Sequence, residues 1–140
     1  MSGLAGLLAG HFEPGVYTWH AAFDPPEVQR AVEHAGAQFA YVDGWAHQSK
    51  AEFLAAAAEA LDFPDWFGHN LDALADCLDD LDVSPVVVLW DGWGTLARSE
   101  PETFALVVEI LAGRARSVTP PFSALLRGAG PETEITSLDS

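Results

Sequence analysis

The stretch LDFPDWFGHNLDALADCLDDLD, residues 61–82, carries most of the information in this sequence. It contains seven aspartates and neither lysine nor arginine. At 100° per residue, its leucines fall on one stripe of a helix and its later aspartates gather on roughly the opposite side. The stripe consists of Leu71, Leu74, Leu78 and Leu81, and the acidic side consists of Asp72, Asp76, Asp79 and Asp80. We therefore expect a helix from about Gly68 to Leu81 that packs its leucines on a core and turns its aspartates to solvent.

The acidic side of this helix is unfavourable for the chain on its own. Asp76 has like charges three and four residues away, and three such pairs destabilise the helix by about 1 kcal/mol in total. Aspartate is also a weak helix former. A helix that needed only a solvated face would gain from mixed glutamate and lysine, so the pattern favours a surface that meets a positively charged partner. A merely solvated acidic face is the alternative interpretation.

Two large aromatic residues precede the helix. Trp66 and Phe67 stand in a short connection, where bulky side chains are less often required by the core. Aromatic anchors beside charged groups are typical of protein interfaces. Alternatively these rings, Phe67 above all, cover the junction between two helices.

Residues 63–78 closely resemble the signature of the barstar family, intracellular inhibitors of small secreted ribonucleases such as barnase. The shared pattern is a proline, an aromatic pair, Gly-x-Asn and then Leu-Asp-Ala-Leu-x-Asp-Cys-Leu. A weaker similarity extends from about Ala40 to Arg127, and residues 1–39 lie outside the minimal family domain. The many matching positions make this resemblance specific.

The resemblance implies that the acidic helix and the loop before it block a ribonuclease active site. Asp76 matches the aspartate that takes the place of the substrate phosphate, and Asp72 matches a neighbouring interface carboxylate. Trp66 matches a tyrosine that stacks on an enzyme histidine. The full set of residues expected to bind the partner is Trp66, Phe67, Gly68, Asn70, Asp72, Asp76 and Asp79.

Two positions depart from the family pattern. Ala75 stands where the best-known member has a tryptophan, which removes contact area. A contact glutamate on the later helix is matched by Ile110, although Glu109 is adjacent. Both departures concern which ribonuclease is bound.

The rest of the chain predicts an α/β fold with a small, mostly parallel β-sheet packed against helices. Short β-branched or apolar runs predict strands near residues 15–19, 38–43, 85–90 and 122–126. Capping residues and helical periodicity predict helices near residues 25–36, 50–61, 68–81 and from 101 onward. Residues 91–94 are predicted to form a turn. We expect one domain over residues 1–128, with a strand–helix extension in 1–39, a barstar-like core in 40–127 and a frayed tail in 129–140.

Composition limits the classes of partner. The formal net charge is −15, from 6 Lys+Arg and 21 Asp+Glu, so nucleic acids would be repelled. Cys77 is the single cysteine, and the first ten residues contain no basic residue, so neither a disulfide framework nor a signal peptide is expected. No apolar run approaches the length of a membrane span. We expect a cytoplasmic protein that binds neither nucleic acid nor membrane.

The same residues could in principle serve two functions other than inhibition. His69, Asp72 and Asp76 have the spacing of one helix face, but no second His/Cys cluster supports a metal site. Asp72 and Asp76 could form a catalytic carboxylate pair, but an exposed face does not separate their pKa values. The sequence also lacks a P-loop and a Gly-x-Ser-x-Gly motif.

The expectation is therefore an inhibitor, not an enzyme, that needs no cofactor or metal. Its expected partner is a small guanyl-specific, barnase-like ribonuclease, bound in a 1:1 complex. A barstar-like module that binds a different basic protein is the alternative.

Overall fold

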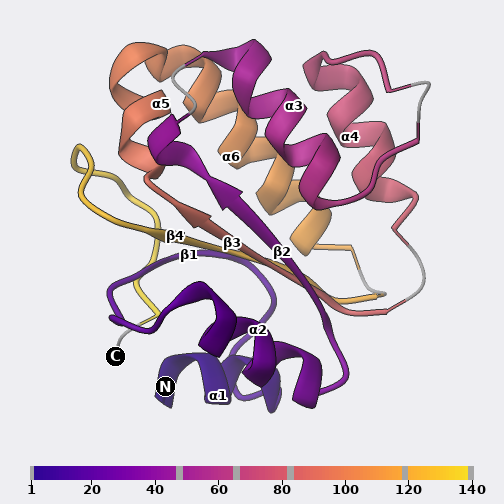
Figure 1. Ribbon diagram of the computed structural model, residues 1–140, viewed down its shortest axis with the longest axis vertical. Helices are drawn as coiled ribbons and strands as arrows, with labels where there is room; N and C mark the ends of the chain where they lie inside the picture. Colours follow the sequence, from indigo (N-terminus) through magenta and orange to yellow (C-terminus); the bar gives the residue numbers. More distant parts are fainter. Residues whose placement is uncertain (1, 47–48, 65–66, 82–83, 118–119, 139–140) are drawn as a thin grey trace.

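The computed structural model describes residues 2–46, 49–64, 67–81, 84–117 and 120–138 (Figure 1). The elements follow one another as α1 (Ser2–Leu8), β1 (Val16–Trp19), α2 (Pro25–His34), β2 (Gln38–Asp43), the 3-10 helix η1 (Gly44–Ala46), α3 (Lys50–Ala60), α4 (Leu71–Asp79), β3 (Val86–Asp91), α5 (Trp93–Ser99), α6 (Pro101–Ala115) and β4 (Phe122–Arg127). The described strands form one parallel sheet in the order β1-β4-β3-β2. This arrangement confirms the predicted α/β fold.

Strand β3 occupies an interior position of the sheet because its sequence is apolar on both faces. It pairs with β2 on one side and β4 on the other, and all of its residues are buried. Successive side chains of a strand point to opposite faces. Val88 and Trp90 therefore belong to one core cluster, and Val87 and Leu89 belong to another.

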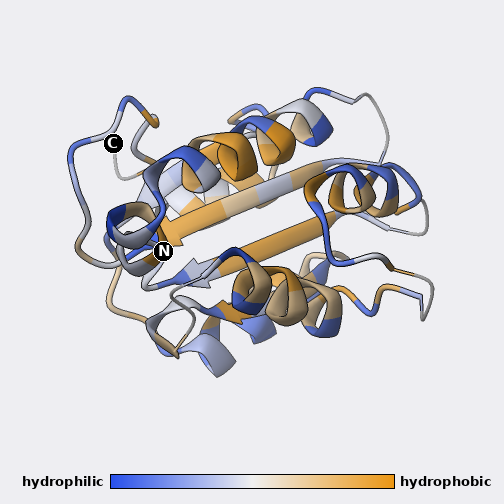
Figure 2. Ribbon diagram, turned by 90° about the horizontal axis from the view of Figure 1, so that it is seen from above, coloured by the Kyte–Doolittle hydropathy of each residue, from blue (hydrophilic) through white to orange (hydrophobic). Residues whose placement is uncertain are grey.

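Helices cover both faces of the sheet (Figures 1 and 2). The face of Val88 and Trp90 packs against α3, α4, α5 and α6. The face of Val87 and Leu89 packs against α1 and α2. The longest helix, α6, has 15 residues, and no described helix is long and apolar enough to cross a membrane.

The N-terminal extension does more than add an edge strand. Its strand β1 lies at an edge of the sheet, beside β4. Helix α1 was not predicted from the sequence, because seven residues that include two glycines have a low helix propensity. Its buried residues Leu4 and Leu7 pack in the second core cluster, so tertiary contacts stabilise this helix.

The expectation of a frayed tail from residue 129 is wrong. The backbone N–H of Thr18 in β1 donates to the Thr136 carbonyl at 2.9 Å, and the Leu138 N–H donates to the Thr18 carbonyl at 2.8 Å. Leu138 is only 1% exposed and belongs to the same core cluster as α1 and α2. Because the tail is mostly polar, its sequence did not predict that Leu138 would be buried.

Helix boundaries also differ from the sequence expectation. The predicted turn at residues 91–94 contains the end of β3, a left-handed Gly92 (φ 69°) and the first residues of α5. Trp93 is buried against the backbone at Gly130, and this contact holds the short helix in place. Helix α4 begins at Leu71 and ends at Asp79, so it is shorter at both ends than predicted.

Candidate protein-binding site

Asn70 determines where the acidic helix begins. Its backbone is extended, and its Oδ1 accepts a hydrogen bond from the Ala73 N–H at 2.8 Å. A side-chain oxygen at this position satisfies one of the unpaired N–H groups of the first turn. Its Nδ2 also donates to the Gly68 carbonyl at 3.4 Å, which ties the preceding loop to the helix.

The loop before α4 is held by an aromatic cluster. Phe67 is 5% exposed, and its ring centre lies 5.1 Å from that of Phe63 and 4.9 Å from that of His69. The prediction that Phe67 offers its ring to a partner therefore needs correction, because the ring packs in the core. Its role in this structure is to fix the loop.

The four later aspartates lie on the solvent side of α4. Asp72, Asp76, Asp79 and Asp80 are exposed, whereas Leu74, Cys77 and Leu78 on the opposite side are buried. This orientation confirms the periodicity argument. Gly68 and Asn70 are also exposed, at the N-terminal end of the same face.

The carboxylates of this acidic face are available to an outside partner. Within the described ranges, no lysine, arginine or histidine forms an ion pair with Asp72, Asp76 or Asp79. The ion pair that the structure does show joins Arg127 to Asp91 at 2.7 Å, on β4 and β3. The negative charge of α4 therefore remains directed to solvent.

The negative field of α4 also reaches its buried side. Burial raises the pKa of the Cys77 thiol, and the nearby charges of Asp80 and Asp76 raise it further. The thiol is consequently held protonated and unreactive. It serves as a small apolar core residue, in agreement with its place beneath the acidic face.

Some predicted positions lie elsewhere. Trp66, the expected stacking residue, lies outside the described residues. On α6, Glu109 is exposed and Ile110 is partly buried against the core, so Glu109 presents the carboxylate on that helix. Among the residues that the structure describes, no cluster of His, Cys, Asp or Glu is arranged to hold a metal ion.

A second polar site, missed by the sequence analysis, lies at the carboxyl ends of the strands. Asp91 accepts two hydrogen bonds from Arg127, at 2.7 and 2.9 Å, and one from the Tyr41 hydroxyl at 2.8 Å. Burial raises the pKa of Tyr41, and the hydrogen bond to Asp91 adds to this effect. The strand register predicts this meeting, since Asp91 and Arg127 are cross-strand neighbours, but the sequence alone does not reveal the register.

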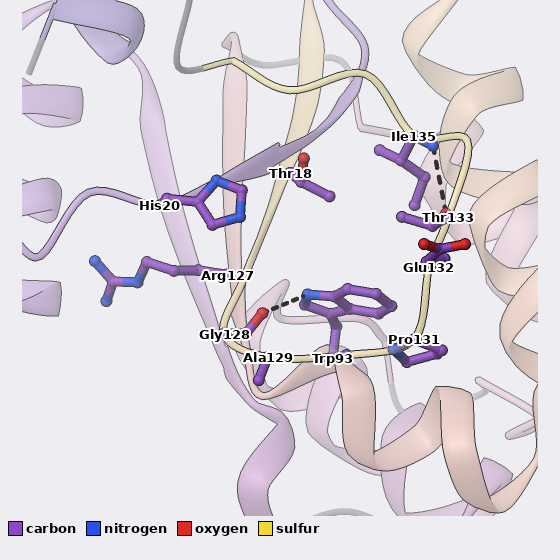
Figure 3. Close-up of a pocket in the computed structure, with 11 residues that line it drawn as sticks. Thr18, His20, Trp93, Arg127, Gly128, Ala129, Pro131, Glu132, Thr133 and Ile135 are labelled. Carbon is purple, nitrogen blue, oxygen red and sulfur yellow. Dashed lines mark hydrogen bonds between the residues drawn. The ribbon is translucent and has the colours of Figure 1, made fainter.

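A cavity of about 830 Å³ lies next to this network (Figure 3). Thr18 and His20 line it from the end of β1, Trp93 from α5, and residues 127–133 and Ile135 from the C-terminal segment. The guanidinium of Arg127 points away from it and donates to Asp91 and to two backbone carbonyls. The Trp93 Nε1 likewise donates to the Gly128 carbonyl at 3.2 Å. These groups serve the fold, which leaves the acidic face as the stronger candidate site.

The sequence matches the family described as Barstar (barnase inhibitor) over residues 37–127. The chain belongs to the barstar family. The match includes the whole of the acidic face and the loop before it, and it leaves out α1, β1 and α2. A comparison with curated proteins found no match.

Solved structures resemble this barstar-family chain in fold alone. The ORC2 protein of Aeropyrum pernix, solved in ADPNP and ADP complexes, is 17% identical with a TM-score of 0.61 over 91% of this chain. The CDC6p protein of Pyrobaculum aerophilum is 14% identical with a TM-score of 0.51 over 89% of this chain. This chain covers only 38% and 37% of the length of those two proteins, respectively. The similarity therefore concerns the fold and not their activities.

Proposed function

We propose that this protein is a cytoplasmic inhibitor of a small, guanyl-specific ribonuclease, which it blocks in a 1:1 complex without performing chemistry itself. One observation carries the proposal. The family's acidic motif folds into a helix whose carboxylates, Asp72, Asp76 and Asp79, are exposed and make no ion pair within the described part of the chain.

A ribonuclease site binds a phosphodiester with basic side chains, and a carboxylate can take the place of the phosphate. Charge-assisted hydrogen bonds between arginine and a carboxylate are short, strong and often bidentate. Asp76 lies in the middle of α4, between a capped N-terminus and a packed C-terminus. A rigid helix loses little conformational entropy when it binds, which favours tight association.

The overall charge supports the same partner. A net charge of −15 attracts a basic enzyme and accelerates encounter, a behaviour for which the barnase–barstar pair is itself the usual example. The fold similarity to nucleotide-complexed proteins does not favour an ATPase. The sequence contains no G-x-x-x-x-G-K-[ST] motif, and its single lysine, Lys50, follows Ser49.

The test is inhibition of RNA cleavage. The purified chain is titrated into barnase and a panel of other small guanyl-specific ribonucleases, and cleavage of a fluorogenic RNA is followed. We expect stoichiometric inhibition of at least one enzyme, and loss of inhibition with the double variant Asp72→Asn, Asp76→Asn. Glu33→Gln, which removes an exposed charge from α2 on the other side of the sheet, is the matched control.

Three results would contradict the proposal. If no ribonuclease is inhibited and the chain instead captures an unrelated basic protein through the same face, the alternative binding module is correct. If the isolated chain turns over a substrate, the protein is an enzyme. Full inhibition by the double variant would show that the acidic face is not the inhibitory surface.

A further inference from the structure

Arg114 is a buried cation located beneath the end of the acidic helix. It lies in the last turn of α6, and the residue is only 4% exposed. Its Nε donates to the Leu78 carbonyl at 2.8 Å, and its Nη2 donates to the Leu81 carbonyl at 3.0 Å. Nη2 also donates to the Pro120 carbonyl at 3.1 Å, and the guanidinium lies 5.6 Å from the ring centre of Phe122. Arg114 therefore joins α4 and α6 to the segment that enters β4.

These contacts reinforce the C-terminal end of α4, where the Leu78 carbonyl also accepts a hydrogen bond from the Leu81 N–H at 3.2 Å. The last carbonyls of a helix have no partner within the helix, and they carry the negative end of its dipole. The guanidinium supplies both hydrogen-bond donors and positive charge at this point. Asp79 and Asp80 are located at the same end, where a negative charge is unfavourable. The buried cation counters that unfavourable charge from inside.

The geometry of Arg114 leaves the acidic face free. All three hydrogen bonds go to backbone carbonyls, and in the described ranges Arg114 forms no ion pair with a carboxylate. The guanidinium therefore offsets the field of the aspartates without occupying the oxygens that a partner would use. An arginine can do this because its planar fork holds several donors in fixed directions, whereas a lysine cannot reach the same acceptors together.

We propose that Arg114 is the positioning residue of the acidic face, holding the last turn of α4 in the geometry that a basic partner requires. Its importance for binding rests on the proposed function. The effect of Arg114 on the structure of α4 does not rest on the proposed function, because this effect can be measured in the free protein.

The first experiment measures amide hydrogen exchange in the free protein. In Arg114→Met, we expect the amides of Asp79, Asp80 and Leu81 to exchange at least about tenfold faster relative to the slowest amides of β3, because the end of α4 opens locally. Val107→Ala is the matched control, since Val107 is fully buried in the same helix. This control should accelerate exchange by a common factor over the whole core. A uniform acceleration in Arg114→Met as well would overturn the proposal.

The second experiment measures the kinetics of binding to barnase. Arg114→Met keeps every aspartate, so the association rate should stay within about twofold, whereas the dissociation rate should rise about tenfold. Arg114→Lys should restore part of that loss, and Val107→Ala should leave both rates unchanged. Unchanged dissociation in Arg114→Met would overturn the positioning role. If the unmodified chain does not bind any ribonuclease, the proposed function fails, and hydrogen exchange still decides whether Arg114 holds α4.

Discussion

Asp76 and Asp91 carry the same side chain in opposite surroundings. Asp91 is buried at the end of β3 and accepts hydrogen bonds from Arg127 and Tyr41. Asp76 is exposed in the middle of α4, and no ion pair involves it in the part of the chain that the structure describes. A carboxylate that is already satisfied contributes to the fold, whereas an unsatisfied one can contribute to binding. The environment of each aspartate, not its type, decides its role.

Replacing Asp76 with alanine should weaken the ribonuclease complex by about 2–5 kcal/mol, because the basic groups of the enzyme lose their counter-charge in a buried interface. The free energy of unfolding of the free protein should not fall, since one set of like-charge pairs is relieved. Isothermal titration calorimetry and urea unfolding measure the two quantities. Glu33→Ala is the control and should leave affinity nearly unchanged. Equal affinity for Asp76→Ala and the parent chain would rule out the phosphate-mimic role.

One buried and two partly buried ionisable groups predict a loss of stability at high pH. Burial raises the pKa values of Cys77 and Tyr41, and the same holds for Tyr17. Their stabilising effect is complete below the pKa values of the unfolded chain, about 8.5 for cysteine and about 10 for tyrosine, and it declines as the pH rises toward the folded values. Urea unfolding between pH 7 and pH 10 should therefore show a falling free energy of unfolding.

Cys77 should also resist a thiol reagent at pH 8 until the protein unfolds. Rapid labelling of the native protein would contradict its burial.

At the scale of single elements, helices with strong local signals were predicted and helices without them were missed. Ser49 caps α3 as expected, through a hydrogen bond from the Glu52 N–H, and Pro101 begins α6. Helices α1 and α5 lack such signals, and both are short and contain glycine, which has a low helix propensity. Both form because neighbouring elements cover them. In α4 the leucine stripe packs on the core as predicted, but the helix begins at Leu71 and not at Gly68, because Asn70 caps it.

Replacing Asn70 with alanine should lower the free energy of unfolding by about 1 kcal/mol, because the first turn of α4 loses its cap. The same change should weaken partner binding more than it weakens the fold, since the exposed loop is released with it. Asn70→Asp keeps a capping oxygen and serves as the control. Urea unfolding and titration calorimetry test this prediction, and an unchanged midpoint for Asn70→Ala would show that the cap contributes little.

At the scale of the whole molecule, the two ends of the chain form one cover over the second face of the sheet. Leu4 and Leu7 of α1 and Leu138 of the tail share a core cluster with Val87 and Leu89. Both segments lie outside residues 37–127, which match the family. Without this cover, an apolar sheet face would be exposed to water. The extension and the tail therefore pack directly against the family core.

Replacing Leu138 with alanine should lower the free energy of unfolding by about 2–5 kcal/mol, although the residue is the third from the end of the sequence, because its side chain is fully buried. Leu106, which is 48% exposed on α6, is the control. Its change to alanine should have an effect below about 0.5 kcal/mol. Urea unfolding measures both variants. Equal, small effects would show that the tail does not contribute to the core.

The net charge predicts a strong salt dependence of association. Raising the ionic strength screens the attraction between the acidic face and a basic enzyme, so the association rate should fall while the dissociation rate changes little. Stopped-flow fluorescence at several salt concentrations measures both rates. An association rate that does not depend on salt would contradict electrostatic capture.

The fold class, the family motif and the direction in which the aspartates of α4 point all follow from the amino-acid sequence. Each of these follows from local rules, since periodicity, caps and apolar runs act between residues that are close along the chain. By contrast, the burial of Phe67, the anchoring of the tail by Leu138 and the position of Arg114 under the end of α4 depend on the three-dimensional packing. These contacts join segments far apart in the sequence, and they depend on strand order and register, which no local pattern encodes. For this reason the acidic face could be predicted, whereas the residues that hold it could not.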